Sequence, residues 1–344
     1  PSAFSTSPMV SASSRAGPSV PSVSVSGKGA LTGLGSGKGL TGSGSGAGHG
    51  GIGSDAGSPA MMRPCYDAIK RPWMVGSGFS GNGGGAVKLT VGGTLYLDST
   101  IDAEGAHIDN QYSGSGGSIW ITCRKLVGSG DLDADGGRTH NNLWRGGGGR
   151  IAVWQTGATG LDDYTGKMTT YGGQVDNGQG ILPNTIKASG GTVYLHDQDE
   201  PEDGGRLIID YNNGTRTANG NYPDQLLRTD FPSTVCGDEG EKPFANLTVI
   251  LKRGAALNLR ADVTIGHLVV EQEAKADLKP VVRCNGYTLT VSGPTRKRVI
   301  ADTLSKMTVS TSDTRYSNSA PKEVTTELGG EIVWLQRGLV IMVR

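Results

Sequence analysis

One short phrase of sequence recurs at a fixed distance, and this recurrence limits the folds that the chain can adopt. A pair of glycines followed by alternating apolar and polar residues begins at Gly84, Gly116 and Gly148, 32 residues apart both times (84 to 116, 116 to 148). Further copies begin at Gly190 and Gly329. Self-similarity at a period of roughly 20–50 residues is typical of stacked-repeat proteins.

The residues after each glycine pair indicate a β-strand. Val87, Leu89 and Val91 alternate with Lys88 and Thr90, which is the period-2 pattern of a half-buried strand. We therefore predict an all-β fold, a mostly parallel β-helix (β-solenoid) with one continuous core and glycines at corners with positive φ. An antiparallel β-sandwich is the alternative, but its hairpin strands would recur at about 8–12 residues.

Composition divides the chain into five segments. They are 1–57, a Ser/Gly-rich N-terminal segment; 58–82, an apolar cap or excursion bearing Met and Cys; 83–293, the β-helix; 294–328, a polar linker; and 329–344, a C-terminal strand. Glycine occupies nearly every second position between residues 27 and 50. This spacing fits either a flexible linker or a strand whose bare face another backbone can approach. For the apolar segment, a protein-binding surface is the alternative.

Charge and cysteine content exclude several classes of function. Lys plus Arg and Asp plus Glu each number 32, so net charge gives no reason to expect nucleic acid as a partner. No apolar run reaches the ~18 residues of a membrane span. The chain starts at Pro1, which suggests a processed product or a missing start. Its cysteines fit two disulfides with open pairing or four buried thiols: Cys65, Cys123, Cys236 and Cys284.

Several glycine phrases carry a resemblance to a known group of proteins. The phrases at 46–51, 116–121, 147–153, 190–195, 244–249 and 285–291 resemble the glycine-rich repeat segments of large secreted or cell-surface proteins from environmental bacteria. The resemblance covers roughly residues 42–293. It implies an extracellular β-solenoid that builds or decorates a surface, and it implies no catalytic residues.

Polysaccharide-degrading enzymes also use β-helices, and their residue patterns are not found here. A polygalacturonase-type site would need paired carboxylates followed by His-Gly and Arg-x-Lys. Asp162-Asp163 is the only Asp pair, the only His-Gly begins upstream at His49, and Arg-x-Lys does not occur. The acidic loop 197–203 could bind the calcium of a lyase, but a solvated loop explains it as well. We therefore expect no enzymatic activity and no catalytic residue.

Two pairs of carboxylates, each 31 residues apart (102 to 133, 104 to 135), come close to register if the 32-residue period equals whole coils. Asp102 then lies over Asp133 and Glu104 over Asp135, at the ~4.8 Å spacing of neighbouring strands. Such charges repel unless water or a cation separates them. Calcium is therefore the one cofactor that the pattern allows, with solvation as the alternative.

A second column contains aromatic residues. Lys88, Trp120, Ala152 and Tyr194 occupy the middle position of successive phrases and are expected to point outward. Trp120 and Tyr194 could then stack against a glycan or a second protomer. The alternative is that a loop of the same chain covers them.

The C-terminus favours self-assembly. It ends on an apolar strand, which we predict to be donated to another copy, or else to fold back on its own chain: Leu339, Val340, Ile341, Met342 and Val343. We expect an extracellular structural or filament-forming protein built by end-to-end association, with itself as partner. A carbohydrate-binding adhesin is the second hypothesis, and a polysaccharide lyase or hydrolase is the third.

Overall fold

The structure consists of β-strands and loops. The computed structural model describes residues 22–38, 46–54, 64–108, 111–139, 145–174, 188–212, 228–233, 244–270 and 280–292, together with the backbone of three strands within 325–343. These residues contain no helix, so none of them forms a helix that could cross a membrane. Cys236 and residues 294–324 of the predicted polar linker lie outside the described residues, whereas 325–327 of that linker form strand β17.

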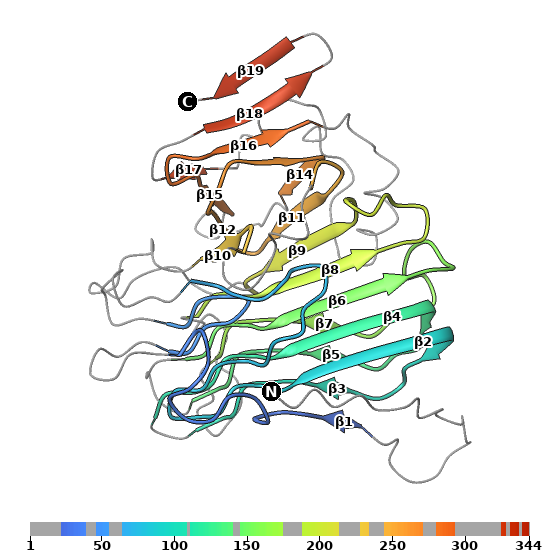
Figure 1. Ribbon diagram of the computed structural model, residues 1–344, viewed down its shortest axis with the longest axis vertical. Helices are drawn as coiled ribbons and strands as arrows, with labels where there is room; N and C mark the ends of the chain where they lie inside the picture. Colours follow the sequence, from blue (N-terminus) through green and yellow to red (C-terminus); the bar gives the residue numbers. More distant parts are fainter. Residues whose placement is uncertain are drawn as a thin grey trace.

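The strands form four sheets along the long axis of the molecule (Figure 1). A seven-stranded sheet has the order β14-β11-β9-β8-β6-β4-β2, and three four-stranded sheets have the orders β1-β3-β5-β7, β10-β12-β15-β17 and β13-β16-β18-β19. The strand bounds are β1 Val23–Ser24, β2 Ala86–Tyr96, β3 Ile101–Asp102, β4 Ser118–Val127, β5 Leu132–Asp133, β6 Arg150–Gln155, β7 Met168–Thr169, β8 Thr192–His196, β9 Arg206–Asp210, β10 Thr229–Phe231, β11 Thr248–Lys252, β12 Ala256–Leu259, β13 Val263–Ile265, β14 His267–Val270, β15 Val281–Arg283, β16 Thr288–Val291, β17 Thr325–Glu327, β18 Glu331–Gln336 and β19 Leu339–Val343.

The repeated phrases become neighbouring parallel strands. Val87 pairs with Ile119, Ile119 with Ile151, and Ile151 with Val193 across β2, β4, β6 and β8. The 32-residue period therefore equals the register of β2 with β4 and of β4 with β6, whereas the pairing of β6 with β8 joins residues 42 apart (193 − 151). This part of the sequence prediction is confirmed.

The predicted β-solenoid is nevertheless wrong, because the chain forms separate sheets instead of one continuous coil. Strand β9 pairs antiparallel with β8, so the strand direction reverses in the middle of the seven-stranded sheet. The connection between them, residues 197–205, is shorter than the dozen or more residues that a parallel crossover needs. The antiparallel sandwich does not describe the fold either, since only β8–β9 and β18–β19 pair antiparallel among the described strands.

Two cores on opposite faces of the seven-stranded sheet replace the single core of a solenoid. One face, called face A, packs against the sheet of β3 and β5 and includes Ile119, Ile151 and Ile208. The other, called face B, carries Tyr194 and Leu207 into a second core with strands β10 to β16. A chain that buries both faces of one sheet cannot wind around one continuous interior.

The glycine pairs lie where backbones pack closely. Within the described chain, the glycines of the first four pairs lack positive φ, which is found at other glycines such as Gly128 and Gly205. A Cβ built on Gly116 would lie 2.0 Å from the carbonyl oxygen of Ala134, and one on Gly29 would lie 2.1 Å from that of Gly84. Glycine is required because no side chain fits between these backbones.

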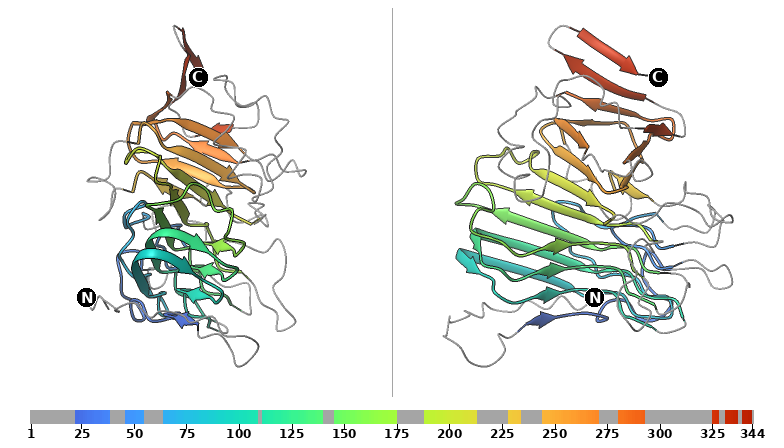
Figure 2. Two further views of the ribbon diagram at one scale, coloured as in Figure 1. Left: turned by 90° about the vertical axis from the view of Figure 1, so that its right-hand side faces the viewer. Right: turned by 180° about the vertical axis from the view of Figure 1, so that it is seen from behind.

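The N-terminal glycine-rich segment is part of this close packing. The amide of Gly51 donates to the carbonyl of Gly148 at 2.9 Å, and that of Gly147 donates to Ala47 at 2.8 Å. In Figures 1 and 2 the segment, drawn in blue, lies beside the green connections of the seven-stranded sheet. Of the two interpretations of the alternating glycines, close backbone approach therefore applies to the described residues 27–38 and 46–54.

The C-terminal strand pairs with its own chain. Strand β19 runs antiparallel to β18, with Ile332 opposite Val343 and Gln336 opposite Leu339. Within the single chain Leu339–Val343 thus folds back on β18, and donation of this strand to another copy stays a prediction.

Candidate functional site

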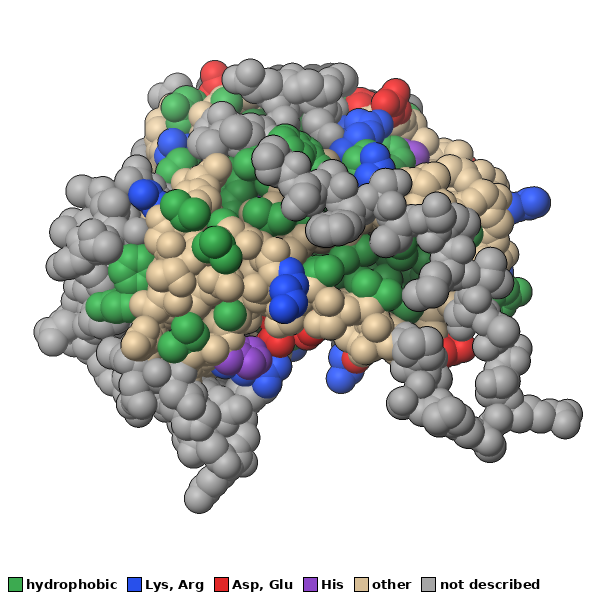
Figure 3. Space-filling view, turned by 60° about the horizontal axis from the view of Figure 1, so that its bottom comes forward, with side chains coloured by type: hydrophobic (Ala, Val, Ile, Leu, Met, Phe, Trp, Pro, Cys, Tyr) green, Lys and Arg blue, Asp and Glu red, His purple; other side chains and the backbone are tan. Residues whose placement is uncertain are grey.

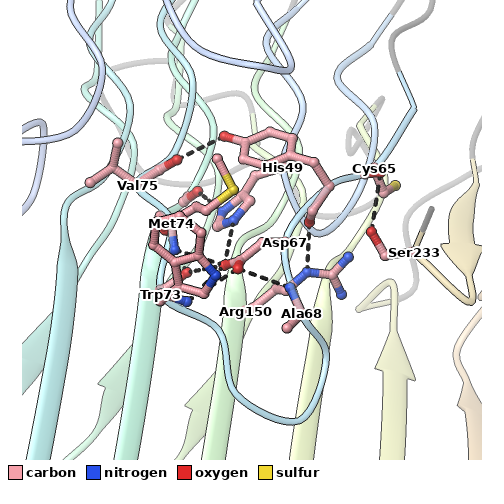
Figure 4. A network of polar contacts seen from close by, with 12 residues as sticks. His49, Cys65, Asp67, Ala68, Trp73, Met74, Val75, Arg150 and Ser233 are labelled. Atoms are coloured by element: carbon pink, nitrogen blue, oxygen red, sulfur yellow. Dashed lines mark hydrogen bonds and ion pairs between the residues drawn. The ribbon is translucent and has the colours of Figure 1, made fainter. Parts of the chain in front are cut away.

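The apolar segment 64–79 is a lateral excursion that crosses face B and is held there by Asp67. This residue is fully buried with φ of 72°. Its carboxylate accepts backbone N–H groups from Ala68 at 2.8 Å and Met74 at 3.1 Å, and the hydroxyl of Ser118 on β4 at 3.0 Å. The ring Nε2 of His49 lies 3.3 Å away (Figure 4). One buried carboxylate therefore joins the excursion, the glycine-rich segment and the sheet.

Arg150 on β6 holds the same segment from the other side. Its Nε donates to the carbonyl of Tyr66 at 2.9 Å, and its Nη1 donates to the hydroxyl of Thr192 at 2.8 Å. Next to it, the amide of Cys65 donates to the carboxylate of Asp230 on β10 at 3.0 Å. These contacts connect the excursion to β6, where Figure 4 shows Arg150, and to β10.

The Ser118, Asp67 and His49 side chains do not form a catalytic triad. A triad needs a base that accepts the proton of the nucleophile, whereas Ser118 donates to Asp67 and not to His49. All three side chains are fully buried, so no substrate reaches them. The group stabilises the fold. Sequence reasoning missed it, although a charged residue within the most apolar stretch signals a buried polar contact.

Three of the four predicted acidic ligands come together. Oxygen atoms of Glu104, Asp133 and Asp135 lie within 4.8 Å of one another. Asp102 pairs with Asp133 in register, but its carboxylate accepts the hydroxyl of Ser24 at 3.0 Å and the amide of Glu104 at 2.8 Å. The predicted ladder is therefore present, and the cluster that could hold calcium omits Asp102.

Protons and cations compete for this acidic cluster. Burial and the neighbouring carboxylates raise the pKa of Asp133 to about 6, and burial followed by the charge of Asp133 raises the pKa of Asp135 well above its usual value. The guanidinium of Arg138 lies 3.2 Å from Glu104, and the ring of His107 lies 3.4 Å from it. The hydrogen bond to Glu104 raises the pKa of His107. Two basic groups thus already balance one of the three carboxylates.

The aromatic column is largely covered by the chain itself. Tyr194 is fully buried, and its hydroxyl donates to the carbonyl of Gly204 at 2.8 Å. Trp120 is half-buried against the face B core, and the Nζ of Lys88 lies 3.6 Å from its ring centroid. Tyr194 therefore cannot stack against a glycan, and one ring face of Trp120 is occupied.

Among the described side chains, the most exposed tryptophan is one that sequence reasoning did not single out. The side chain of Trp73 is 61% exposed. The backbone of its neighbour Met74 accepts the hydroxyl of Ser118 at 2.7 Å, two residues from Trp120 on the same strand face. Trp73 thus lies beside the position predicted for the aromatic contact.

The molecule has an incompletely buried end at β1 and β2. Val87, Leu89 and Val91 on face A of β2 are only partly buried, as is Val25 near β1. Their counterparts one strand further in are fully enclosed, with Ile119 and Ile121 at 0% exposure. Figure 3 turns this end toward the viewer and shows hydrophobic side chains on the surface. The face A core therefore extends to the β2 edge of the seven-stranded sheet, where no further layer of described residues covers it.

Other predicted residues have structural surroundings. Asp162 and Asp163 are exposed, and Asp163 forms an ion pair with Lys125. Asp197 in the acidic loop is buried against Arg206 at 2.6 Å. The described cysteines are buried free thiols, which excludes two disulfides: Cys65, Cys123 and Cys284.

Comparison with known proteins adds no further assignment. No protein-family model matches the chain, and searches of curated proteins and of solved structures find no significant match.

Proposed function

We propose that the protein is a structural component of the extracellular surface that associates with copies of itself. The observation that supports this proposal is the open end of the face A core at β2. There Val87, Leu89 and Val91 stay partly exposed on β2, which among the described strands has a partner on one side only. Exposed edges with adjacent apolar side chains are the usual places where sheets join.

The energetic reason is burial of apolar surface. Completing the burial of an aliphatic side chain contributes up to about 1.5–3 kcal/mol, and each copy offers several such side chains. Pairing of the edge would also satisfy its free backbone groups. The expected location outside the cell rests on the glycine-rich resemblance alone, and fractionation of the source cells tests it.

Light scattering coupled to gel filtration tests the association. Wild-type protein should exceed the 35.5 kDa mass of one chain as its concentration rises, and Leu89→Lys should remain monomeric. The lysine stem can reach water from this half-buried position, so the fold should persist. Tyr287→Lys is the matched control, because Tyr287 is an exposed apolar residue near the other end of the molecule. A wild-type protein that is monomeric at every concentration contradicts the proposal.

Glycan binding is the second candidate, and the exposed ring of Trp73 favours it. An exposed indole can stack against a sugar ring, and Lys88 nearby has no acidic partner among the described residues. Trp73→Ala should then abolish binding on a glycan array, whereas Tyr96→Ala, which removes an equally exposed ring, should not. Equal loss in both variants would contradict a site at Trp73.

A further inference from the structure

The two edges of the seven-stranded sheet differ in a way that limits how copies can associate. At the β14 edge, Leu268, Val269 and Val270 are at most 5% exposed, whereas the apolar residues of β2 are partly exposed. Strand β19 is also an edge strand, paired only with β18, but it belongs to a different, four-stranded sheet. Among the described residues, the β2 end has no complementary open edge of the same sheet to receive it. A second β2 end offers the same free edge and the same partly exposed apolar side chains, and is therefore complementary to it.

The backbone groups available for pairing on β2 follow from its contact with β4. The amide of Ser118 donates to the carbonyl of Gly85 at 3.0 Å, and Ser118 lies opposite Ala86. In a parallel ladder, the residues bonded to one neighbour alternate along the strand. Val87 and Leu89 therefore bond to β4, and the N–H and C=O groups of Ala86, Lys88 and Thr90 point to the free edge.

A bulge limits the length of the strand that can pair. The register to β4 shifts between Val91 and Thr94, and Gly92 and Gly93 lie in this interval. Bulges and lysines commonly protect edge strands from pairing. Here Lys88 lies over the ring of Trp120 on face B, so it leaves the edge itself open. The segment from Ala86 to Val91 is therefore the one available for pairing.

We infer that two copies join through antiparallel pairing of β2 with β2 about a two-fold axis at Leu89. This inference rests on the proposed function. In this register Leu89 faces its own symmetry mate, and Val87 faces Val91 of the second copy. All three side chains stay on face A, so the two open cores meet. A two-fold contact of this kind is self-complementary and closed.

The same register satisfies the edge without placing like charges opposite each other. Lys88 lies opposite Thr90 of the second copy, and the two such pairs supply about four backbone hydrogen bonds. A register centred one residue earlier would place the two Lys88 side chains directly opposite, which is unfavourable. The centre at Leu89 therefore suits both the hydrogen bonds and the charges.

Disulfide trapping in the full-length chain tests the register. The Leu89 positions form a non-hydrogen-bonded antiparallel pair with a Cα separation of about 4.5 Å, which a disulfide can span. Leu89→Cys should give a covalent dimer under mild oxidation. Val87→Cys alone should not, whereas Val87→Cys combined with Val91→Cys should. Wild-type protein is the control for its own thiols, of which Cys65, Cys123 and Cys284 are buried.

The outcomes separate this inference from the proposed function. Cross-linking of Leu89→Cys without cross-linking of Val87→Cys supports the two-fold register. A dimer by light scattering that Leu89→Cys does not trap overturns the register and leaves self-association in place. A protein that stays monomeric at every concentration overturns both.

Discussion

The seven-stranded sheet has two ends that differ in burial although they belong to one continuous ladder. At β14, Val269 on face A is 3% exposed and its neighbours are similarly enclosed. At β2, Leu89 on the same face is only partly buried. Both strands carry apolar side chains of similar size, so residue type does not explain the difference. The difference shows that a side chain of this sheet is enclosed only where the next layer is present.

The largest expected effect concerns the excursion 64–79, which covers face B of the interior strands but not that of β2. Asp67→Ala removes the acceptor for several buried donors, and each unpaired group costs about 1–3 kcal/mol. We expect the free energy of unfolding to fall by about 5 kcal/mol. Chemical denaturation measures it.

A conservative change separates charge from backbone strain at the same position. Asn tolerates the positive φ of Asp67 better than Ala does, so Asp67→Asn should lose less stability. Near wild-type stability in Asp67→Ala would show that the excursion does not depend on this carboxylate.

Substitution by alanine should have opposite effects on stability at a glycine enclosed by backbone and at a glycine with open space around it. Gly116 is enclosed by backbone, and an alanine Cβ there would lie 2.0 Å from the Ala134 carbonyl oxygen. Gly92, at the bulge of β2, has open space around it. We expect Gly116→Ala to cost about 3 kcal/mol or more and Gly92→Ala to be neutral or slightly stabilising. Thermal unfolding of both variants measures these changes in stability. Equal losses of stability in the two variants would contradict the close backbone packing at Gly116.

Truncation of an aliphatic side chain should cost more one strand away from the edge. Ile121 on β4 is fully buried, so Ile121→Ala should cost about 3 kcal/mol. Its register partner Leu89 on β2 is partly exposed, so Leu89→Ala should cost about 1 kcal/mol in dilute protein. At high concentration, association should increase the loss for Leu89→Ala. A loss that is large at every concentration would mean that β2 is already enclosed.

A smaller effect than the loss of Asp67 concerns the acidic cluster in the sheet that begins at β1. The folded pKa values of Asp133 and Asp135 are raised, so this cluster stabilises the fold below about pH 4 and loses that contribution as the pH rises through the folded values. The free energy of unfolding, and with it the melting temperature, should therefore fall as the pH rises from about 4 through about 6, the folded pKa of Asp133, and the loss in free energy should be about 2 kcal/mol. Asp135→Asn should flatten the profile.

Calcium addition at pH 8 distinguishes the two hypotheses for the cluster. A bound cation would restore the melting temperature of the wild type but not that of Asp135→Asn. No response in either protein would contradict calcium binding and leave the solvated cluster.

The sequence predicted the strand register but not the organisation of the sheets. The spacing of Gly84, Gly116 and Gly148 equals the pairing of β2, β4 and β6. The sequence predicts positive φ at corner glycines in general, which Gly128 shows, whereas the paired glycines are required because no side chain fits beside them; sequence alone cannot distinguish these two needs. The reversal at β9 depends on a short acidic connection that the repeat pattern does not encode.

The candidate sites were predictable where they depend on register and not where they depend on tertiary contacts. Glu104, Asp133 and Asp135 come together because adjacent strands align. Tyr194 is buried because face B carries a second core, which local alternation cannot reveal. The role of Asp67 depends on partners as distant in sequence as Ser118.

Hydrogen exchange measured as a function of protein concentration tests the difference between the two edges most directly. The free-edge amides of Ala86, Lys88 and Thr90 should exchange quickly in dilute protein and become protected as the concentration rises. The amides of β14 should keep the same protection throughout. Protection of the β2 amides that does not change with concentration would contradict association through this edge.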